Sequence, residues 1–199
     1  MMQKLLIATN NPAKIREYQE IFNTLPLSLT SLAAEGIDLD PEETGTTFEA
    51  NALLKVEVFA AASGLLTLAD DSGLEIDALG GEPGVYSARY GNTAKHDHQA
   101  RYQIVLDKMK DVPWAERTAR FRCVIALATS GGVVGTVEGT VEGFIANVPK
   151  GSGGFGYDPI FFVPEFEQTM AQLPPAEKHR ISHRGRAARA VIPLLERIK

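Results

Sequence analysis

Two adjacent aspartates, Asp70 and Asp71, are the residues best suited to chemistry in this sequence. They follow the apolar run Leu65 to Ala69 and precede Ser72-Gly73. We expect the apolar run to be a strand that ends at these carboxylates, because loops at strand ends carry the functional groups of α/β enzymes. Two aspartates in a dry pocket repel each other unless a cation or a proton lies between them. The pair therefore indicates a divalent-metal site, and the alternative is a solvated Asp-Asp-Ser-Gly turn.

A glycine-rich segment around Phe155 is the second candidate for chemistry. Four of the six residues from Gly151 to Gly156 are glycine, which permits a close approach of the backbone to a ligand. An aromatic residue in such a loop can stack on a flat ring, and Phe155 is placed to do so. The alternative is a flexible linker that leads into a strand over 160–163.

The first element of the chain offers a place for an anion. Residues 4–9 read as a buried strand, and Asn11 and Pro12 are suited to the cap and the first position of the helix that follows. The N-terminus of a helix attracts anions through its N–H groups and its dipole. Lys14 in the first turn is poorly placed for the dipole, and a contact with phosphate would explain it. The sequence lacks the Gly-rich pattern of a P-loop.

The remaining elements follow from periodicity and turn signals. In the helix after Thr46-Thr47, Asn51 and Lys55 share a face that points into a cleft or into solvent, and solvent is the default expectation. Pro193 interrupts the last helix, where we expect a kink or an early end. Ser130-Gly131-Gly132 joins two strands into a hairpin. Strands are expected at 4–9, 28–32, 65–69, 118–129, 133–144 and 160–163, and helices at 13–22, 47–63, 97–109 and from about 187 onward.

Size and composition indicate a globular protein of one domain, or of one domain with two lobes. The chain has 199 residues, of which 44% are apolar and 23% charged. No apolar run approaches the ~18 residues of a membrane helix, so we expect no membrane contact. A single cysteine, Cys123, fits a reducing cytoplasm and lies in an apolar run typical of buried positions.

The charges are distributed unevenly. The net charge of −5 argues against general binding to nucleic acid. Residues 35–49 hold six acids and no base, and residues 178–199 hold seven bases and one acid. If these segments face each other across a cleft, one side suits a cation and the other an anion, as a metal–polyphosphate substrate requires. The alternative is two separately solvated faces.

Five segments in this order resemble the inosine triphosphate pyrophosphatases, a family that hydrolyses deaminated purine nucleoside triphosphates. Each segment alone is a weak signal, but together they extend over nearly the whole chain. The segments are ATNNPAK (8–14), EETGTTFEANALLK (42–55), LADDSGLEIDALGGEPGVYSARY (68–90), GGFGYDPIF (153–161) and EKHRISHRGRA (177–187). Arg101-Tyr102 and Pro193 depart from the family's usual helix patterns, which bears on packing and not on the site.

The resemblance implies roles for individual residues. It places the catalytic base at Asp71, with support from Asp70 and Lys55. It places a magnesium ion (Mg2+) on Glu43 and Asp71, which supply the oxygen ligands that Mg2+ takes in small number. The substrate-binding residues that it implies fall into two groups. Thr9, Asn10, Asn11 and Lys14 belong to a triphosphate-binding turn, and Ser72 contacts the phosphate or the sugar. The residues that recognise the purine are Phe155, Gly156, Tyr157, Asp158, Lys178, His183 and Arg184.

The resemblance also implies the fold and the reaction. We expect an α/β fold in which a mixed central β-sheet is flanked by helices, with two lobes and a cleft between them, in a single domain over residues 1–199. We expect Mg2+-dependent hydrolysis of ITP, dITP and XTP to the monophosphate and pyrophosphate, which cleanses the nucleotide pool. A cytoplasmic homodimer is implied as well. The alternatives are a pyrophosphatase for pyrimidine or modified triphosphates, and a nucleotide sensor without turnover.

Overall fold

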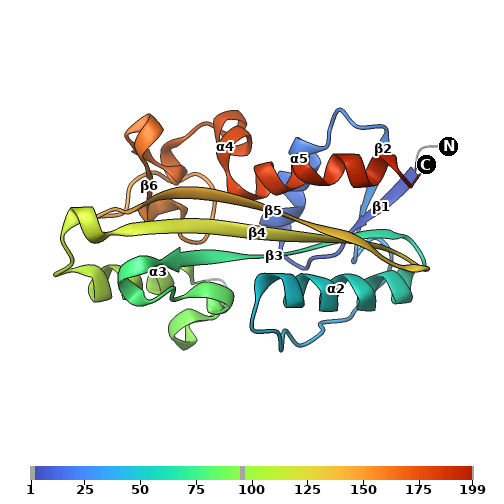
Figure 1. The fold of residues 1–199 in the computed structure, drawn as a ribbon, viewed down its shortest axis with the longest axis horizontal. Coiled ribbons are helices and arrows are strands. Elements are labelled where there is room, and N and C mark those ends of the chain that lie inside the picture. Colours follow the sequence, from blue (N-terminus) through green and yellow to red (C-terminus); the bar gives the residue numbers. More distant parts are fainter. Residues whose placement is uncertain (1–2, 95–96, 199) are drawn as a thin grey trace. The chain divides into compact units, whose positions relative to one another are not determined.

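The computed structural model describes residues 3–94 and 97–198, and Figure 1 labels most of its main elements. The strands are β1 (Gln3–Ile7), β2 (Leu27–Ser31), β3 (Leu66–Ile76), β4 (Thr118–Thr129), β5 (Gly132–Ile145), β6 (Phe161–Val163) and β7 (Gln168–Thr169). The α-helices are α1 (Pro12–Ile21), α2 (Phe48–Ser63), α3 (His98–Met109), α4 (Pro175–Ile181) and α5 (His183–Glu196).

The strands form one mixed sheet. Their order is β2-β1-β3-β4-β5-β6-β7. β1 is parallel to β2 and to β3, whereas β6 is antiparallel to β5 and to β7. The neighbours β4 and β5 are joined by two residues, a length that only an antiparallel hairpin allows. The predicted α/β class, the mixed sheet and the hairpin are confirmed.

The chain divides into two compact units, and each combines stretches that are distant in the sequence. Within the described residues, unit 1 comprises the chain up to Asp71, then Cys123–Gly139, and then the chain from Arg184 onward. Unit 2 comprises Ser72–Arg122 and Thr140–His183. The predicted cleft and the single domain over residues 1–199 stay predictions.

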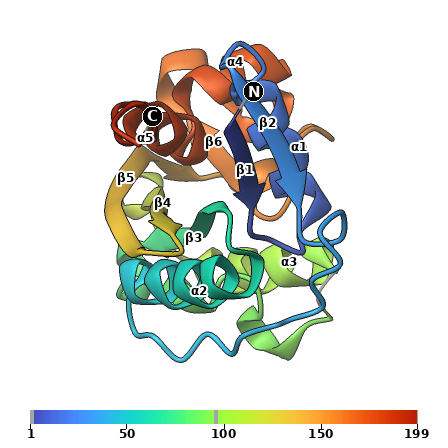
Figure 2. The same ribbon diagram turned by 90° about the vertical axis from the view of Figure 1, so that its right-hand side faces the viewer.

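In unit 1, helices cover both faces of the strands. Alternate strand residues such as Leu5, Ile7 and Leu68 form one apolar cluster with Tyr18 of α1 and Val191 of α5. Figures 1 and 2 show α2 on the face of the unit 1 parts of β4 and β5 opposite to α5. Because successive strand side chains point to opposite faces, this burial on both sides explains why Cys123 to Ala128 are all buried.

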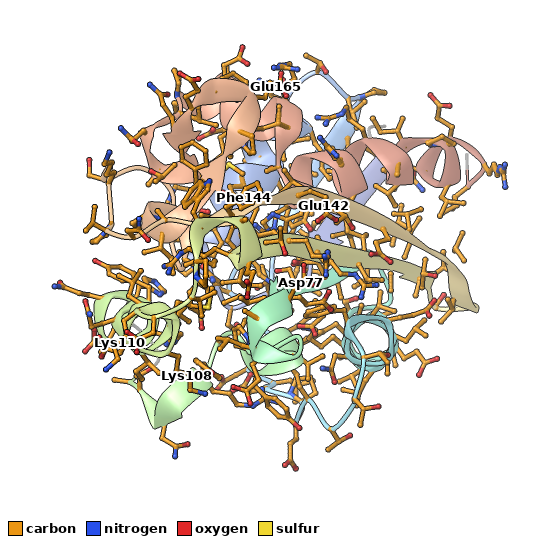
Figure 3. The ribbon with its side chains drawn as sticks, turned by 60° about the vertical axis from the view of Figure 1, so that its left-hand side comes forward. Asp77, Lys108, Lys110, Glu142, Phe144 and Glu165 are labelled. Carbon is orange, nitrogen blue, oxygen red and sulfur yellow. The ribbon has the colours of Figure 1, made fainter. Side chains whose placement is uncertain are left out.

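Unit 2 has a core of its own, built around Phe121, Val141 and Phe161. At its surface, Arg120 forms ion pairs with Asp77 and Glu142, two residues that Figure 3 labels. Arg120 Nη1 is 2.9 Å from Asp77 Oδ1, and its Nε is 3.1 Å from Glu142 Oε2. This exposed bridge links the end of β3 to the β4–β5 hairpin.

The path of β3 corrects the sequence prediction. The strand was expected to end at the aspartates, but it continues through them to Ile76. Leu74 and Ile76 are fully buried, so the apolar pattern resumes beyond Gly73 and keeps the chain extended. Asp70 and Asp71 are therefore consecutive residues of a strand and point to opposite faces of the sheet. The expectation that the two carboxylates repel each other in one dry pocket was therefore wrong, and so was the alternative of a turn at these residues.

The helix caps agree with the sequence. The Asn11 side chain accepts hydrogen bonds from the backbone N–H groups of Ala13 and Lys14. Thr47 caps α2, which ends at Gly64 in the left-handed conformation, with φ of 68°. Of the two alternatives expected at Pro193, the early end was wrong, because α5 continues to Glu196. The kink stays a prediction. Across residues 3–94 and 97–198, no helix is both long enough and apolar enough to cross a membrane.

Candidate active site

Asp70 faces a buried group of cations in unit 1. Its Oδ2 accepts hydrogen bonds from Lys14 Nζ at 2.8 Å and from Arg184 Nη2 at 3.3 Å. Cys123 Sγ lies 3.6 Å from the same oxygen. Lys14 comes from the first turn of α1 and Arg184 from the first turn of α5, so two helices bring their charges to one carboxylate of β3.

The two cations decide the charge of Asp70. Burial alone would raise the pKa of this carboxyl group, but Lys14 and Arg184 together hold it well below its ordinary value. In the opposite sense, burial would lower the pKa of Arg184, whereas Asp70 and Glu17 raise it. Asp70 is therefore an ionised, tightly paired carboxylate and a poor proton acceptor.

Asp71 faces α2 on the other side of the sheet. Its Oδ1 accepts a hydrogen bond from Lys55 Nζ at 3.0 Å, and its Oδ2 accepts one from Asn51 Nδ2 at 3.2 Å. The same Lys55 ammonium is 2.6 Å from Glu43 Oε1. The structure thus brings Glu43, from the acidic loop, and Asp71, from the strand, to one cation.

The pKa of Asp71 moves in the opposite direction to that of Asp70. Burial raises the pKa of Asp71, and this outweighs the lowering by Lys55 and Lys14. Burial lowers the pKa of Lys55, but the carboxylates of Asp71 and Glu43 more than compensate and raise it. Two neighbouring carboxylates in different environments are thereby suited to different roles.

Glu43 and Asp71 are suited to hold a divalent metal. Their oxygens already converge on a positive charge, the ammonium of Lys55. Among residues 3–94 and 97–198, no group of three or more His, Cys, Asp or Glu side chains is arranged around a metal position. Two protein carboxylates fit Mg2+, which keeps several waters and binds substrate phosphates as well. A metal such as structural zinc, which requires four protein ligands, does not fit this pair.

The predicted phosphate turn at residues 9–14 is shaped by its own side chains. Thr9 Oγ1 accepts a hydrogen bond from the backbone N–H of Asn11 at 3.2 Å, and Asn10 Nδ2 donates to Leu39 O at 3.4 Å. Asn11 is the cap of α1, so two of the first N–H groups of the helix are already bound. Of the residues in this turn, Lys14 is the one whose charged side chain contacts Asp70.

Three of the predicted purine residues form a second cluster, in unit 2, whereas Arg184 belongs to unit 1. Lys178 Nζ is 2.7 Å from Asp158 Oδ2 and lies 5.2 Å from the centre of the Phe155 ring. Asp158 Oδ2 also accepts a hydrogen bond from the backbone N–H of Phe155, which fixes the loop. Gly154 has φ of 68°, and a Cβ there would collide with the Asp158 carboxylate. The glycine is therefore required by the ion pair beside it.

The other predicted residues of unit 2 lie in different places: Tyr157 and His183 are buried, Gly156 is in the loop and Ser72 is in β3. Tyr157 is buried, and its hydroxyl donates to Ser87 O at 2.9 Å. The His183 ring stacks on Phe121 with centroids 4.7 Å apart. Gly156 follows Phe155 in the loop with φ of 65°, and Ser72 follows Asp71 in β3. The roles of these residues in binding stay predictions.

Two residues of unit 1 were missed or misplaced by the sequence analysis. Asn51 was expected at a solvated face, but it is fully buried between Gly45 and Asp71. Glu17 was not singled out at all, although its Oε2 is 2.6 Å from Arg184 Nη1. The available signal was helical spacing: Lys14 and Glu17 are three residues apart, and Asn51 and Lys55 are four apart.

Comparison with known proteins places the chain among relatives of nearly equal length. A dITP/XTP pyrophosphatase of Bacillus subtilis (strain 168) is 49% identical over 196 residues, which cover 98% of each chain. A dITP/XTP pyrophosphatase of Geobacter sulfurreducens is 50% identical over 186 residues, covering 94% of this chain and 93% of that one. The solved Ham1 protein of Staphylococcus aureus is 42% identical, with a TM-score of 0.86, and the match covers 99% of this chain and all of that one.

The model of the Ham1 family matches residues 5–194. This match includes all five segments that carried the resemblance, and with the near-full-length relatives it confirms the predicted family. On this evidence of sequence and fold together, the chain belongs to the Ham1 family.

Proposed function

We propose that this chain is a nucleoside triphosphate pyrophosphatase that hydrolyses dITP, ITP and XTP to the monophosphate and pyrophosphate. The observation that carries the proposal is the identity of about half of all residues, over nearly the full length, to relatives named dITP/XTP pyrophosphatase. The buried arrangement of Lys14, Lys55 and the two aspartates supports it, because phosphoryl transfer depends on positioned charge.

Asp71 is the proton acceptor in this proposal. A water molecule attacks the α-phosphorus, the bond to the β-phosphate oxygen breaks, and Asp71 takes the proton of the water. Asp71 is favoured over Asp70 because an effective base has a pKa nearer to the working pH, and burial raises the pKa of Asp71. Asp70, paired with Lys14 and Arg184, serves to place Lys14.

The phosphates are bound by cations of unit 1. Lys14 and Lys55 supply point charges to the phosphate oxygens. Glu43 and Asp71 are the residues that would hold Mg2+. When bound, the ion adds Lewis-acid stabilisation of the charge that develops on the phosphates. Lys55 contacts both carboxylates and thereby keeps their oxygens converging on one point.

The purine is assigned to unit 2. Phe155 offers a ring face for stacking, and Lys178 is fixed beside it by Asp158. Hypoxanthine and xanthine carry an acceptor oxygen at C6, where adenine carries a donor. N–H donors of His183 and of the loop at Phe155 would pair with this oxygen and oppose the amine. The resemblance also assigns Arg184 to the purine, and that role stays a prediction.

A substrate panel tests the proposal. dITP, ITP, XTP, GTP and ATP are incubated with the purified protein, with and without Mg2+, and released pyrophosphate and monophosphate are measured. We expect turnover of the first three and dependence on the ion, with discrimination against ATP on the order of 10⁴. Preference for pyrimidine triphosphates, or binding without turnover, would replace this function with one of the alternatives. The proposal also includes a location in the cytoplasm and a homodimer. Size-exclusion chromatography tests the homodimer separately.

A further inference from the structure

Four side chains of alternating charge contact one another in a row in the interior of unit 1. Glu17 Oε2 is 2.6 Å from Arg184 Nη1, Arg184 Nη2 is 3.3 Å from Asp70 Oδ2, and Lys14 Nζ is 2.8 Å from that same oxygen. The Arg184 side chain is 2% exposed and that of Glu17 is 10% exposed. Glu17 and Lys14 are on the same face of α1, one turn apart. The first and the last of these four side chains, Glu17 and Lys14, therefore belong to the same helix.

Lys14 has two roles that it cannot fill at the same time. In the structure it neutralises Asp70, and in the proposed reaction it binds phosphate. If Lys14 leaves Asp70, a buried ionised carboxylate loses its nearest cation, and an uncompensated buried charge is strongly unfavourable. The cost is small only if a second cation stays on the same oxygen. Arg184 is that cation, provided that its guanidinium is held in place.

We propose that Glu17 is a positioning residue that holds Arg184 on Asp70, so that Lys14 is released to the substrate phosphates. The inference rests on the proposed function. Glu17 makes the shorter contact with Arg184, and a charge-assisted bond in a buried site fixes the guanidinium in one orientation. Glu17 acts through Arg184 and Lys14, because its carboxylate is at the opposite end of this row of charges from Lys14.

Replacement of Glu17 by glutamine keeps the size of the side chain and removes its charge. Arg184 then loses its anchor, and Lys14 becomes the main cation of Asp70. We expect E17Q to raise KM for dITP and the dissociation constant for inorganic tripolyphosphate about tenfold, with kcat changed less than about threefold. Glu17→Asp, which keeps the charge, restores part of the affinity.

The decisive measurement is a double-mutant cycle with Lys14→Met. Tripolyphosphate binding is measured by calorimetry without metal for the wild type, E17Q, K14M and the double variant. We expect E17Q to weaken binding only where Lys14 is present. Glu20→Gln, at an exposed position of the same helix, is the matched control and should bind as the wild type does.

The outcomes separate the inference from the proposed function. An equal loss from E17Q in both backgrounds, or no loss at all, overturns the role of Glu17. If E17Q does not fold, Glu17→Asp carries the same cycle, with its smaller loss again expected only beside Lys14. A wild type that binds tripolyphosphate but releases no pyrophosphate from dITP refutes the proposed function and leaves the binding cycle to decide the role of Glu17.

Discussion

At the scale of single residues, Asp70 and Asp71 differ because a strand sends consecutive side chains to opposite faces. Asp70 meets Lys14 and Arg184, whereas Asp71 meets Lys55 and Asn51. The first carboxylate is held ionised, and burial raises the pKa of the second. The alternation of side chains along β3 thus places a fixed charge and a titratable group at consecutive positions, which is the division that acid–base chemistry requires.

Asp71→Asn tests the titratable member. The variant lacks the proton acceptor, so we expect turnover of dITP to fall more than tenfold, which corresponds to about 1.4 kcal/mol of transition-state stabilisation. In the wild type, kcat/KM should fall about tenfold per pH unit below a pKa that lies above the ordinary value of 3.8. A raised pKa also means that the charge costs stability at neutral pH, so the unfolding midpoint of the variant should not decrease. Turnover within tenfold of wild type would remove Asp71 from this role.

Asp70→Asn tests the fixed charge. The variant leaves the ammonium of Lys14 and the guanidinium of Arg184 buried without their shared carboxylate, and we expect it to lose about 3–5 kcal/mol of unfolding free energy. The folded-state pKa is lowered, so the stability from Asp70 is present above the unfolded pKa of about 3.9 and is lost as the pH falls through the folded value. Urea titrations at pH 7 and pH 3 should show a smaller difference between the two proteins at pH 3. A difference that does not change with pH would contradict the pairing.

At the scale of elements, the loop from Gly151 to Asp158 is organised by an ion pair and not by its flexibility. Asp158 binds both Lys178 of α4 and the backbone of Phe155. Two of its glycines have almost the same positive φ but different surroundings. Gly154 is packed against the Asp158 carboxylate, whereas a Cβ at Gly156 would meet no atom within 4 Å.

Substitution of these two glycines by alanine separates strain from packing. Gly156→Ala carries only the left-handed backbone cost of about 1–2 kcal/mol. Gly154→Ala carries the same cost and also displaces Asp158 from Lys178, so we expect a total loss larger by about 3 kcal/mol. Guanidinium-induced unfolding measures both. Equal losses in the two variants would mean that the ion pair adapts to the methyl group.

At the scale of the whole molecule, the charges are paired more completely than their counts indicate. The bases counted from residue 178 onward include Lys178 on Asp158, Arg180 on Glu177 and Arg184 on Glu17 and Asp70. Lys55, in turn, neutralises acids of the segment 35–49 and of β3. Charge counting therefore overestimates how positive the C-terminal segment is.

The paired charges predict indifference to long polyanions. With a net charge of −5 and these cations in ion pairs, the protein should gain little from counterion release on nucleic acid. We expect single-stranded DNA in excess, at about 0.1 M salt, to leave dITP turnover unchanged. Inhibition that weakens steeply as the salt concentration rises would reveal a basic surface. Duplex DNA serves as the second competitor.

The sequence predicted those features that depend on neighbours along the chain. The cap at Asn11, the end of α2 at Gly64 and the β4–β5 hairpin are local, and all three are confirmed. The course of β3 was not predictable in this way, because Asp70, Asp71 and Gly73 have the composition of a turn. Their extended conformation depends on the burial of Leu74 and Ile76 beyond them and on the contacts of Asp70 with α1 and α5, which are distant in the sequence.

The burial of the site residues was also hidden from local analysis. Asn51 and Lys55 are polar residues that share one face of a helix, so solvent was the default expectation. The partners that bury them, Gly45 and Asp71, approach from another loop and from the sheet. Glu17 likewise has its partner 167 residues away. Polar residues at helical spacing predict that their side chains have hydrogen-bond or ion-pair partners, but the fold determines which residues these partners are.

The side-chain amide of Asn51 has two chemically different ends, and each is already used. Its oxygen accepts the N–H of Gly45, and its nitrogen donates to Asp71. Spontaneous deamidation with age turns such an amide into a carboxylate of nearly the same shape. At this position the product would place a buried anion against the carboxylate of Asp71, where an amide donor now stands, and their repulsion would destabilise this part of unit 1.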